Sequence, residues 1–277
     1  MKEPKNIKFI VEVASNHEGN FSLAKEFIKV ASEAGADYDK FQSYRYEDLI
    51  DKKDAHEAWI KKTALSDEEH IHLINECRRH NIQFLTTCFS IQRIKFLASL
   101  GLKEVKVASP DLLSFSMLEK LAESFEHIII STGMHSIKDI RKAIAFLIKN
   151  NINATLLHTV SLYPVPIEKS FMYKFLWLKD NYSKVGYSNH VSSIEPIKFA
   201  MANGAEIIEA HMKLGDSGPG RVTAWDISSK EFVDIIEYRD TLNKILGDPK
   251  WLGKEDFLFT EEFGAQKRFI GRWGDNR

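Results

Sequence analysis

The sequence predicts a single-domain (β/α)8 TIM barrel, and two observations favour this fold class. Eight short apolar runs each end in polar or charged residues, always at the C-terminal end of the run. Segments of helical length with one apolar face separate the runs, and strand alternating with helix eight times is typical of a closed parallel barrel. The runs are FIVEVAS leading to Asn16, YDKFQ to Ser43, FLTTCF to Ser90, EVKVAS to Asp111, HIIIST to Gly133, ATLLHT to Ser161, VGYS to His190 and IIEAHM to Lys213.

Periodicity and capping residues predict the helices between these runs. Residues 21–34 place their apolar side chains on one face, and Gly35 follows as a stop signal. Further helices are expected from residue 90 to 101, 112 to 125, 137 to 147 and 172 to 182. The spacing of a capping box, which starts a helix, occurs at Ser66 with Glu69, Ser192 with Glu195 and Ser228 with Glu231.

Length and composition agree with one barrel domain in the cytoplasm. The chain has 277 residues, a little more than a typical barrel. Its net charge of −1 disfavours a general nucleic-acid or membrane-surface binder. Two cysteines provide no disulfide framework, and the N-terminus has no apolar core of a signal peptide. We therefore expect a cytoplasmic protein that binds neither nucleic acid nor membrane.

Polar residues where the runs end are the candidates for function, because the active site of such a barrel lies at the C-terminal ends of its strands. The predicted strands bring acids, lysines, hydroxyls and imidazoles to one mouth. These residues are Glu12, Lys40, Gln42, Thr87, Lys106, Ser109, Ser131, Ser188, His190 and His211.

Two histidines at the ends of adjacent strands favour a metal site. His190 and His211 end the seventh and eighth runs, so their imidazoles can meet over the mouth. Imidazole nitrogens suit a first-row divalent ion, and an incomplete protein shell leaves positions for substrate oxygens. The alternative is a core histidine, which we favour for His158. His70, His72 and His80 fall on a predicted outer helix and are expected at the surface.

Lysines and hydroxyls at the same mouth favour an anionic substrate. Lys40 and Lys106 supply cations, and the Ser and Thr side chains supply donors that suit phosphate and carboxylate groups. A strand-end lysine can also be merely solvated, and Ser or Thr there is often a helix cap. Two such lysines on neighbouring sides of one mouth shift the balance toward function. Cys88 is interpreted as a residue that packs in the core and has no chemical role.

Segments in all eight units then resemble the sialic-acid synthase family, which comprises N-acetylneuraminate synthases and related nonulosonic-acid synthases. The resemblance covers nearly all of residues 7–246, and the segments occur in order at matching spacing. They are VEVASNHEGN (11–20), GADYDKFQ (35–42), FLTTCFS (84–90), VKVASPD (105–111), IIISTGM (128–134), LLHTVSLYPVP (156–166), GYSNH (186–190) and GAEIIEAHMKL (204–214).

The resemblance implies a barrel that condenses phosphoenolpyruvate with a sugar aldehyde, using a divalent metal such as Mn²⁺ or Mg²⁺. By position it implies that His190 and His211 are the metal ligands, that Glu12 is an essential acid beside the metal, and that Gln42 lies near the acceptor sugar. Asp111 keeps an acid, one methylene shorter, where the family has Glu. A homo-oligomer is also expected. The positions that match phosphoenolpyruvate contacts are Lys40, Thr87, Lys106, Ser109, Ser131, Ser161, Tyr163 and Ser188.

The sequence departs from the family on the acceptor side. We expect the barrel at 1–246, whereas 247–277 resembles the linker to a C-terminal antifreeze-like domain that this sequence does not contain and that a separate chain could supply. A family acid that binds the sugar is replaced by Gly220, and Arg221 is a candidate substitute anchor. Asn189 replaces an acid beside a metal ligand, and Asp39 stands where the family has an apolar residue.

Two other functions are compatible with these residues. In a Schiff-base aldolase or lyase, Lys106 or Lys40 would form an imine with a ketone substrate. Alternatively, the chain would be a non-catalytic binding barrel. The retained charged and imidazole side chains at the mouth make that the less favoured alternative.

Overall fold

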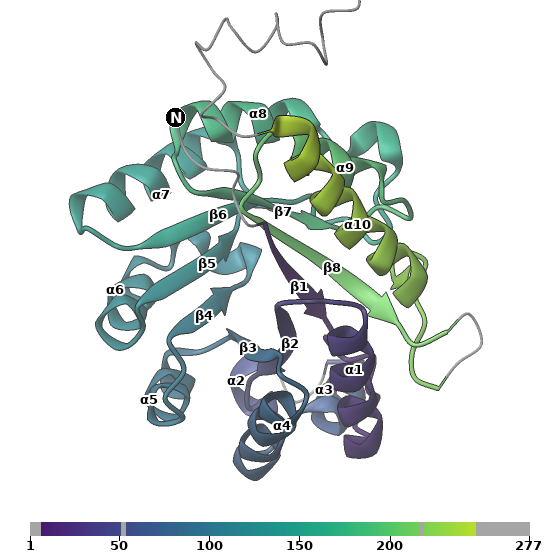
Figure 1. The fold of residues 1–277 in the computed structure, drawn as a ribbon. Helices are drawn as coiled ribbons and strands as arrows, with labels where there is room; N and C mark the ends of the chain where they lie inside the picture. The colour runs from purple at the N-terminus through teal and green to yellow at the C-terminus, as the bar shows by residue number, and fades with distance from the viewer. Residues whose placement is uncertain (1–6, 51–53, 216–218, 248–277) are drawn as a thin grey trace, which may run out of the picture.

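The computed structural model describes residues 7–50, 54–215 and 219–247, and within them the chain forms the predicted (β/α)8 barrel. Eight parallel strands pair in sequence order, and β1 pairs with β8 to close the barrel. Figure 1 shows the purple β1 beside the green β8, with helices around the strands. The strands are β1 Lys8–Glu12, β2 Tyr38–Ser43, β3 Gln83–Cys88, β4 Glu104–Val107, β5 His127–Ser131, β6 Ala154–His158, β7 Val185–Asn189 and β8 Ile207–Lys213, and a short β9 Ile227–Ser228 pairs with β8.

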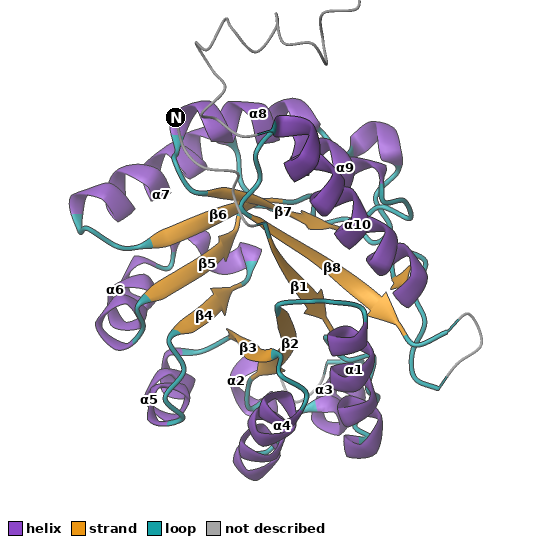
Figure 2. Ribbon diagram, viewed as in Figure 1, coloured by secondary structure: helices purple, strands orange, loops and turns teal. Residues whose placement is uncertain are grey.

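Helices cover the outside of the strands, as the separate colours of Figure 2 make clear. Several bounds agree with the sequence pattern within a few residues. Two short helices after β2 were not predicted, because each is at most seven residues long and has no clear period. The helices are α1 Phe21–Glu33, α2 Tyr46–Leu49, α3 Glu57–Thr63, α4 Asp67–Arg79, α5 Ile91–Ser99, α6 Phe115–Ser124, α7 Ile137–Lys149, α8 Met172–Asn181, α9 Glu195–Ala202 and α10 Ser229–Leu246, with 3-10 helices η1 Ser109–Leu113 and η2 Ile167–Lys169.

Two of the three predicted capping boxes are confirmed and one is wrong. The boxes at the starts of α4 and α10 have both reciprocal hydrogen bonds. At α9, however, the hydroxyl of Ser192 donates to the carbonyl of Ala224, and the N–H of Glu195 donates to Ser193 at 3.2 Å. The loop between β8 and α10 therefore accepts the hydrogen bond of Ser192, the residue that local spacing predicted as the cap of α9.

His70 corrects the prediction that the histidines of this outer helix lie at the surface. Its side chain is fully buried, with Nδ1 2.8 Å from the carbonyl oxygen of Ser66 and its ring against Phe84 and Phe96. Burial lowers the pKa of His70 to about 4, so the imidazole is neutral near pH 7. His72, two residues on, is exposed as expected, because it lies on the other side of α4.

Inside the barrel, an apolar layer separates two polar ends. Inward-facing side chains alternate along each strand, and in the middle of the barrel Ile10, Leu85, Ile129 and Leu157 pack together. A larger apolar shell lies between the strands and the helices, where burying each large side chain stabilises the fold by roughly 2 kcal/mol. Asp39 lies in this shell with no exposed surface and, among the described residues, neither carboxylate oxygen has a partner.

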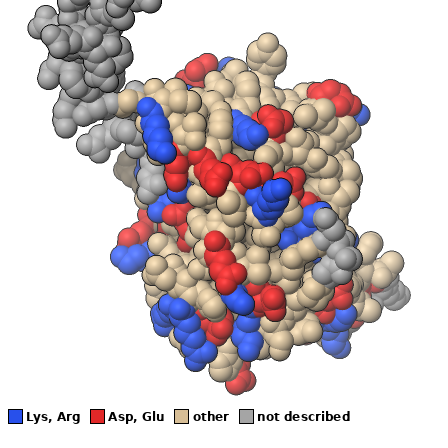
Figure 3. Space-filling view, turned by 45° about the vertical axis from the view of Figure 1, so that its right-hand side comes forward, with Lys and Arg blue, Asp and Glu red and all other residues tan. Residues whose placement is uncertain are grey.

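Charged side chains of both signs are interspersed on the face of the molecule in Figure 3. Among the described residues, no helix is both long and apolar enough to cross a membrane. The expected linker at 248–277 lies outside the described residues.

Candidate active site

The barrel mouth brings charged residues from β1, β2 and β8 to one level. In the strand register, Glu12 lies opposite Lys40 on one side and opposite His211 on the other. Glu12 and Lys40 form an ion pair, and both side chains are almost fully buried. The second oxygen of Glu12 accepts a hydrogen bond from the N–H of Ala14 at 2.7 Å. The closing pair of strands therefore places a buried acid beside a buried lysine and an imidazole.

A second buried acid joins the two lysines. The ammonium nitrogens of Lys40 and Lys106 lie 3.7 and 3.9 Å from carboxylate oxygens of Glu209. Lys40 also donates to the hydroxyl of Thr87 at 2.9 Å, while Lys106 donates to the hydroxyl of Ser131 at 2.5 Å. Strands β2, β4 and β8 thus build one charged cluster in the barrel interior.

Burial and mutual charge set the ionisation of this cluster. Burial lowers the pKa of Lys40 to about 8, although the carboxylate of Glu209 acts in the opposite direction. Burial likewise lowers the pKa of Lys106. For Glu209, burial raises the pKa, but Lys106, Lys40 and the hydrogen bond from Ser188 outweigh it and bring the pKa to about 2. Near pH 7 Lys40 is therefore mostly a cation and Glu209 is an anion.

Glu209 is a functional candidate that the sequence reasoning missed. It lies on β8 two residues before His211, so both side chains face the barrel interior. Ser188 donates to its Oε1 at 2.8 Å. The signal that could have identified Glu209 is its place in the apolar run IIEAHM. It lies two residues before His211, so the strand alternation puts both side chains on the same face.

Hydroxyls and a glycine form a cradle beside Lys106. The N–H of Gly133 donates to the hydroxyl of Ser109 at 3.0 Å. A Cβ on Gly133 would lie 2.9 Å from that hydroxyl and 2.8 Å from Cγ2 of Thr159, and it would also meet the hydroxyl of Ser161. The absence of a side chain at Gly133 therefore lets the side chains of Ser109, Thr159 and Ser161 approach the loop after β5 closely.

His190 and His211 come together as predicted. Their ring centroids are 5.5 Å apart at the ends of β7 and β8. Nδ1 of His190 lies 2.9 Å from the carbonyl oxygen of Val160, which can only accept, so Nδ1 carries the proton and Nε2 has a free lone pair. Burial lowers the pKa of His190, and burial followed by the charge of His190 lowers the pKa of His211 well below its usual value. Both rings are neutral and able to bind a metal.

The protein shell for such an ion is incomplete. Among residues 7–50, 54–215 and 219–247, no group of three or more His, Cys, Asp or Glu side chains is arranged to hold a metal. An ion between His190 and His211 would therefore take water or substrate oxygens as its other ligands, which leaves it open for chemistry.

Aromatic rings border the imidazoles. The ring centroid of Tyr163 lies 4.2 Å from that of His190 and 5.2 Å from that of Trp225. The ring centroids of Trp225 and His211 are 6.3 Å apart. Tyr163 is about half exposed, with a relative exposure of 52%, and the partial burial of its hydroxyl raises its pKa, so this hydroxyl remains a donor near pH 7. The indole N–H of Trp225 is buried and, among the described residues, has no hydrogen-bond partner.

The remaining sequence candidates lie less centrally. Asp111 accepts a hydrogen bond from Ser114 at 3.0 Å within the turn after β4, and burial raises its pKa. Gln42 is partly buried two residues beyond Lys40 on β2. Asn189 is fully buried and donates to the carbonyl of Val191 at 2.9 Å, so it holds the loop after β7.

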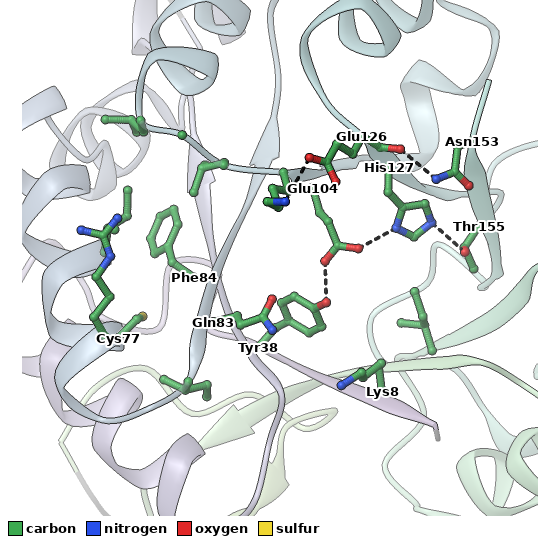
Figure 4. A pocket seen from close by; sticks show the side chains of 18 of the residues that line it. Lys8, Tyr38, Cys77, Gln83, Phe84, Glu104, Glu126, His127, Asn153 and Thr155 are labelled. Carbon is green, nitrogen blue, oxygen red and sulfur yellow. Dashed lines mark hydrogen bonds and ion pairs between the residues drawn. The ribbon is translucent and has the colours of Figure 1, made fainter. Parts of the chain in front are cut away.

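A cavity of about 930 Å³ opens at the opposite, N-terminal end of the barrel. Figure 4 shows a chain of polar side chains in it: Tyr38 donates to Glu104, Glu104 contacts His127 at 2.8 Å, and His127 contacts Thr155 at 2.9 Å. Because these groups satisfy one another, we interpret this end as a structural closure and the mouth as the candidate active site.

The closed barrel with charged groups and an imidazole pair at its mouth defines a (β/α)8-barrel enzyme, and several of its relatives are named as synthases. The sequence model of the NeuB family matches residues 27–250. The chain belongs to the NeuB family.

Individual relatives agree with this assignment. The chain is 32% identical to the N,N'-diacetyllegionaminic acid synthase of Campylobacter jejuni, over 88% of this chain and 78% of the relative. It is 30% identical to the pseudaminic acid synthase of Helicobacter pylori, over 91% and 80%. Its fold matches the N-acetylneuraminic acid synthetase of Leptospira borgpetersenii, solved with citrate, with a TM-score of 0.83 at 28% identity over 92% of both chains.

Proposed function

We propose that this enzyme condenses phosphoenolpyruvate with a sugar aldehyde and releases phosphate, to give a sialic-acid-like nonulosonic or related ulosonic acid. The observation that carries the proposal is the buried pair Lys40 and Lys106, which face one carboxylate at the mouth beside two imidazoles. Buried cations surrounded by hydroxyls suit a ligand that has both a phosphate and a carboxylate. The named activities of the relatives support the same reaction class.

Hydrogen-bond direction supports the binding of an anion at these hydroxyls. Thr87 accepts from Lys40, Ser131 accepts from Lys106, and Ser109 accepts from the N–H of Gly133. Each hydroxyl therefore has its own proton left to donate. Three O–H donors and two ammonium groups at one mouth form a site in which phosphate and carboxylate oxygens would be satisfied.

In the proposed reaction, the C=C electrons of phosphoenolpyruvate form a bond to the aldehyde carbon of the sugar, and the C=O π electrons move to the aldehyde oxygen, which takes up a proton. Water then adds to the adjacent oxocarbenium-like carbon and loses a proton. The C–O bond to phosphate breaks last, and the carbon retains the oxygen of the water as the product's keto group. Lys40 and Lys106 would stabilise the negative charges from the start, without reorganisation during the reaction. Glu12, held by Lys40 and the N–H of Ala14, is the carboxylate proposed to hold the water or a reacting hydroxyl.

His190 and His211 are the residues that would hold a divalent metal ion, Mn²⁺ or Mg²⁺. Their neutral state and the anchored Nδ1 of His190 fit this role. When bound, such an ion supplies Lewis acidity to an aldehyde oxygen. Glu209, two residues before His211 on the same strand, contacts both ammonium groups.

A Schiff-base aldolase is the second candidate, favoured by one observation. A lysine whose pKa burial has lowered to about 8, as for Lys40, can act as an amine nucleophile near neutral pH. Covalent trapping by borohydride in the presence of pyruvate would support this function and contradict the synthase.

The main test is phosphate release from phosphoenolpyruvate with a panel of N-acyl hexosamines, other aldoses and aldose phosphates, with and without Mn²⁺. We expect release that requires both an aldose and the metal. Binding of phosphoenolpyruvate without turnover of any aldehyde would instead indicate a non-catalytic binding barrel.

A further inference from the structure

The loop after β8 lies directly against the loop after β1, and a glycine allows this approach. Gly220 has a φ of +94°, and a Cβ on it would lie 2.7 Å from the carbonyl oxygen of Asn16 and 3.0 Å from Cδ2 of Leu23. No side chain, and therefore no acid, fits at this position without moving the loop. The next residue, Arg221, donates its backbone N–H to the same carbonyl at 3.0 Å.

Asn16 anchors this loop at further points. Its buried side chain donates to the carbonyl of Met212 at 3.2 Å and to the carboxylate of Asp226 at 3.3 Å. Asp226 in turn accepts from the N–H of Thr223 at 2.6 Å. These hydrogen bonds therefore hold the backbone of Arg221 in a defined position beside the mouth.

The side chain of Arg221 is exposed and lies beside an aromatic ring. Its guanidinium carbon lies 5.4 Å from the ring centroid of Trp59 on α3. Among the described residues, Arg221 forms no ion pair with an acidic side chain. A cation–π contact attracts a guanidinium without using its N–H groups as conventional hydrogen-bond donors to a carboxylate.

Arg221 also lies close enough to the imidazole pair to affect it. The pKa of His211 is lowered by burial first, then by His190 and Lys40, and Arg221 contributes in the same direction. Unlike the buried lysines, whose charges face Glu12 and Glu209, the exposed Arg221 has no acidic partner within the described part of the chain.

We propose that Arg221, held by Trp59, is a specificity residue that binds an anionic group on the sugar aldehyde, remote from its reacting carbon. This inference rests on the proposed function and names its acceptor class: an aldose with a phosphate or a carboxylate. The planar guanidinium donates two parallel hydrogen bonds to either group. Lysine, a point charge without this geometry, replaces it only in part.

The test compares kcat/KM for N-acyl hexosamines, their 6-phosphates and aldoses with a carboxylate, in wild type, Arg221→Gln and Arg221→Lys. We expect wild type to prefer an anionic acceptor at least tenfold, and the phosphate and carboxylate arms identify which group. Arg221→Gln should raise KM for the anionic acceptor at least tenfold and leave KM for neutral aldoses and phosphoenolpyruvate unchanged. Arg221→Lys should keep part of the preference.

Arg141→Gln is the matched control, because the guanidinium carbon of Arg141 on α7 lies 5.6 Å from the ring centroid of Trp177 on α8, a similar cation–π contact. It should behave as wild type. An equal loss with all acceptors, or an unchanged preference in Arg221→Gln, would overturn the inference while the proposed function stands. Absence of turnover with every aldose would overturn both.

Discussion

At the N-terminal end of the barrel, Tyr38, Glu104, His127 and Thr155 form a chain of hydrogen bonds, whereas at the mouth Lys40, Lys106 and Glu209 share charges that burial opposes. Burial also raises the pKa of Glu104, but hydrogen bonds from His127 and Tyr38 outweigh it, and the pKa is lowered. At the mouth, burial prevails for both lysines and lowers their pKa values.

The difference separates stability from function within one barrel. A polar network whose members satisfy one another stabilises the fold and leaves little for a ligand. A ligand of the opposite sign stabilises charges that are buried in an unfavourable environment. Shifted pKa values are accordingly typical of functional sites. The apolar layer between the two ends allows each to be changed separately.

The largest expected effect is the difference in activity between a variant of His211 at the mouth and a variant of His127 at the N-terminal end. His211→Ala should lose about a thousandfold in kcat, together with metal binding, because a bound metal is worth several kcal/mol in the transition state. The folded state should persist, since His211 faces the mouth. His127→Ala, at the other end, should keep its activity and lower the free energy of unfolding by about 1 kcal/mol.

Kinetics, metal content and urea unfolding of both variants would check this contrast. Full turnover by His211→Ala, or by wild type treated with a chelator, would contradict the metal hypothesis. Equal loss of activity in both variants would remove the distinction between the two ends.

Lysines provide the next comparison. Lys106→Met should weaken phosphoenolpyruvate binding by about 2–3 kcal/mol, the scale of a charge-assisted contact in a desolvated site. Lys8→Met, at the N-terminal end, removes a partly exposed ion pair with Asp37 and should leave binding unchanged. Isothermal titration with phosphoenolpyruvate measures both. Equal affinity in wild type and Lys106→Met would move this lysine to a structural role.

Asp39 extends the comparison to the shell outside the barrel, where a buried acid lacks a partner. Asp39→Val should raise the free energy of unfolding by about 1–3 kcal/mol. Burial raises the folded pKa of Asp39 above its unfolded value, so the cost of the acid grows as pH rises above about 4. The gain in Asp39→Val should therefore be larger at pH 8 than at pH 4.

Asp37→Val is the matched control, because Asp37 accepts hydrogen bonds from Lys8 and from the N–H of Phe9. It should be destabilised by about 1 kcal/mol. Urea unfolding at both pH values measures the two variants, and a destabilised Asp39→Val would show that the acid has a stabilising role.

The smallest effect is a pH dependence at the mouth. Burial places the pKa of Lys40 at about 8, so phosphoenolpyruvate affinity should fall as pH rises through this value, by up to about tenfold per pH unit. The phosphate itself is ionised well below this range. Constant affinity from pH 7 to 9.5 would show that Lys40 does not bind the ligand as a cation.

The sequence by itself determined the barrel and most of its candidate mouth. Apolar runs and helical periods are local properties, and strand ends in a parallel barrel share one rim, so Glu12, Lys40 and Lys106 could be placed without coordinates. The imidazole pair followed in the same way, because consecutive strands are neighbours. The functional roles of these residues remain predictions.

Only the tertiary structure decided the contacts across the barrel and between its loops. Glu209 meets lysines from β2 and β4, a consequence of strand register that no spacing along the chain reveals. His70 is buried because α4 faces rings from β3 and α5. Arg221 meets Trp59 of α3, and Gly220 lets the same loop approach Asn16, although these segments are far apart in sequence. Such contacts depend on how elements pack, and packing is decided by the whole fold.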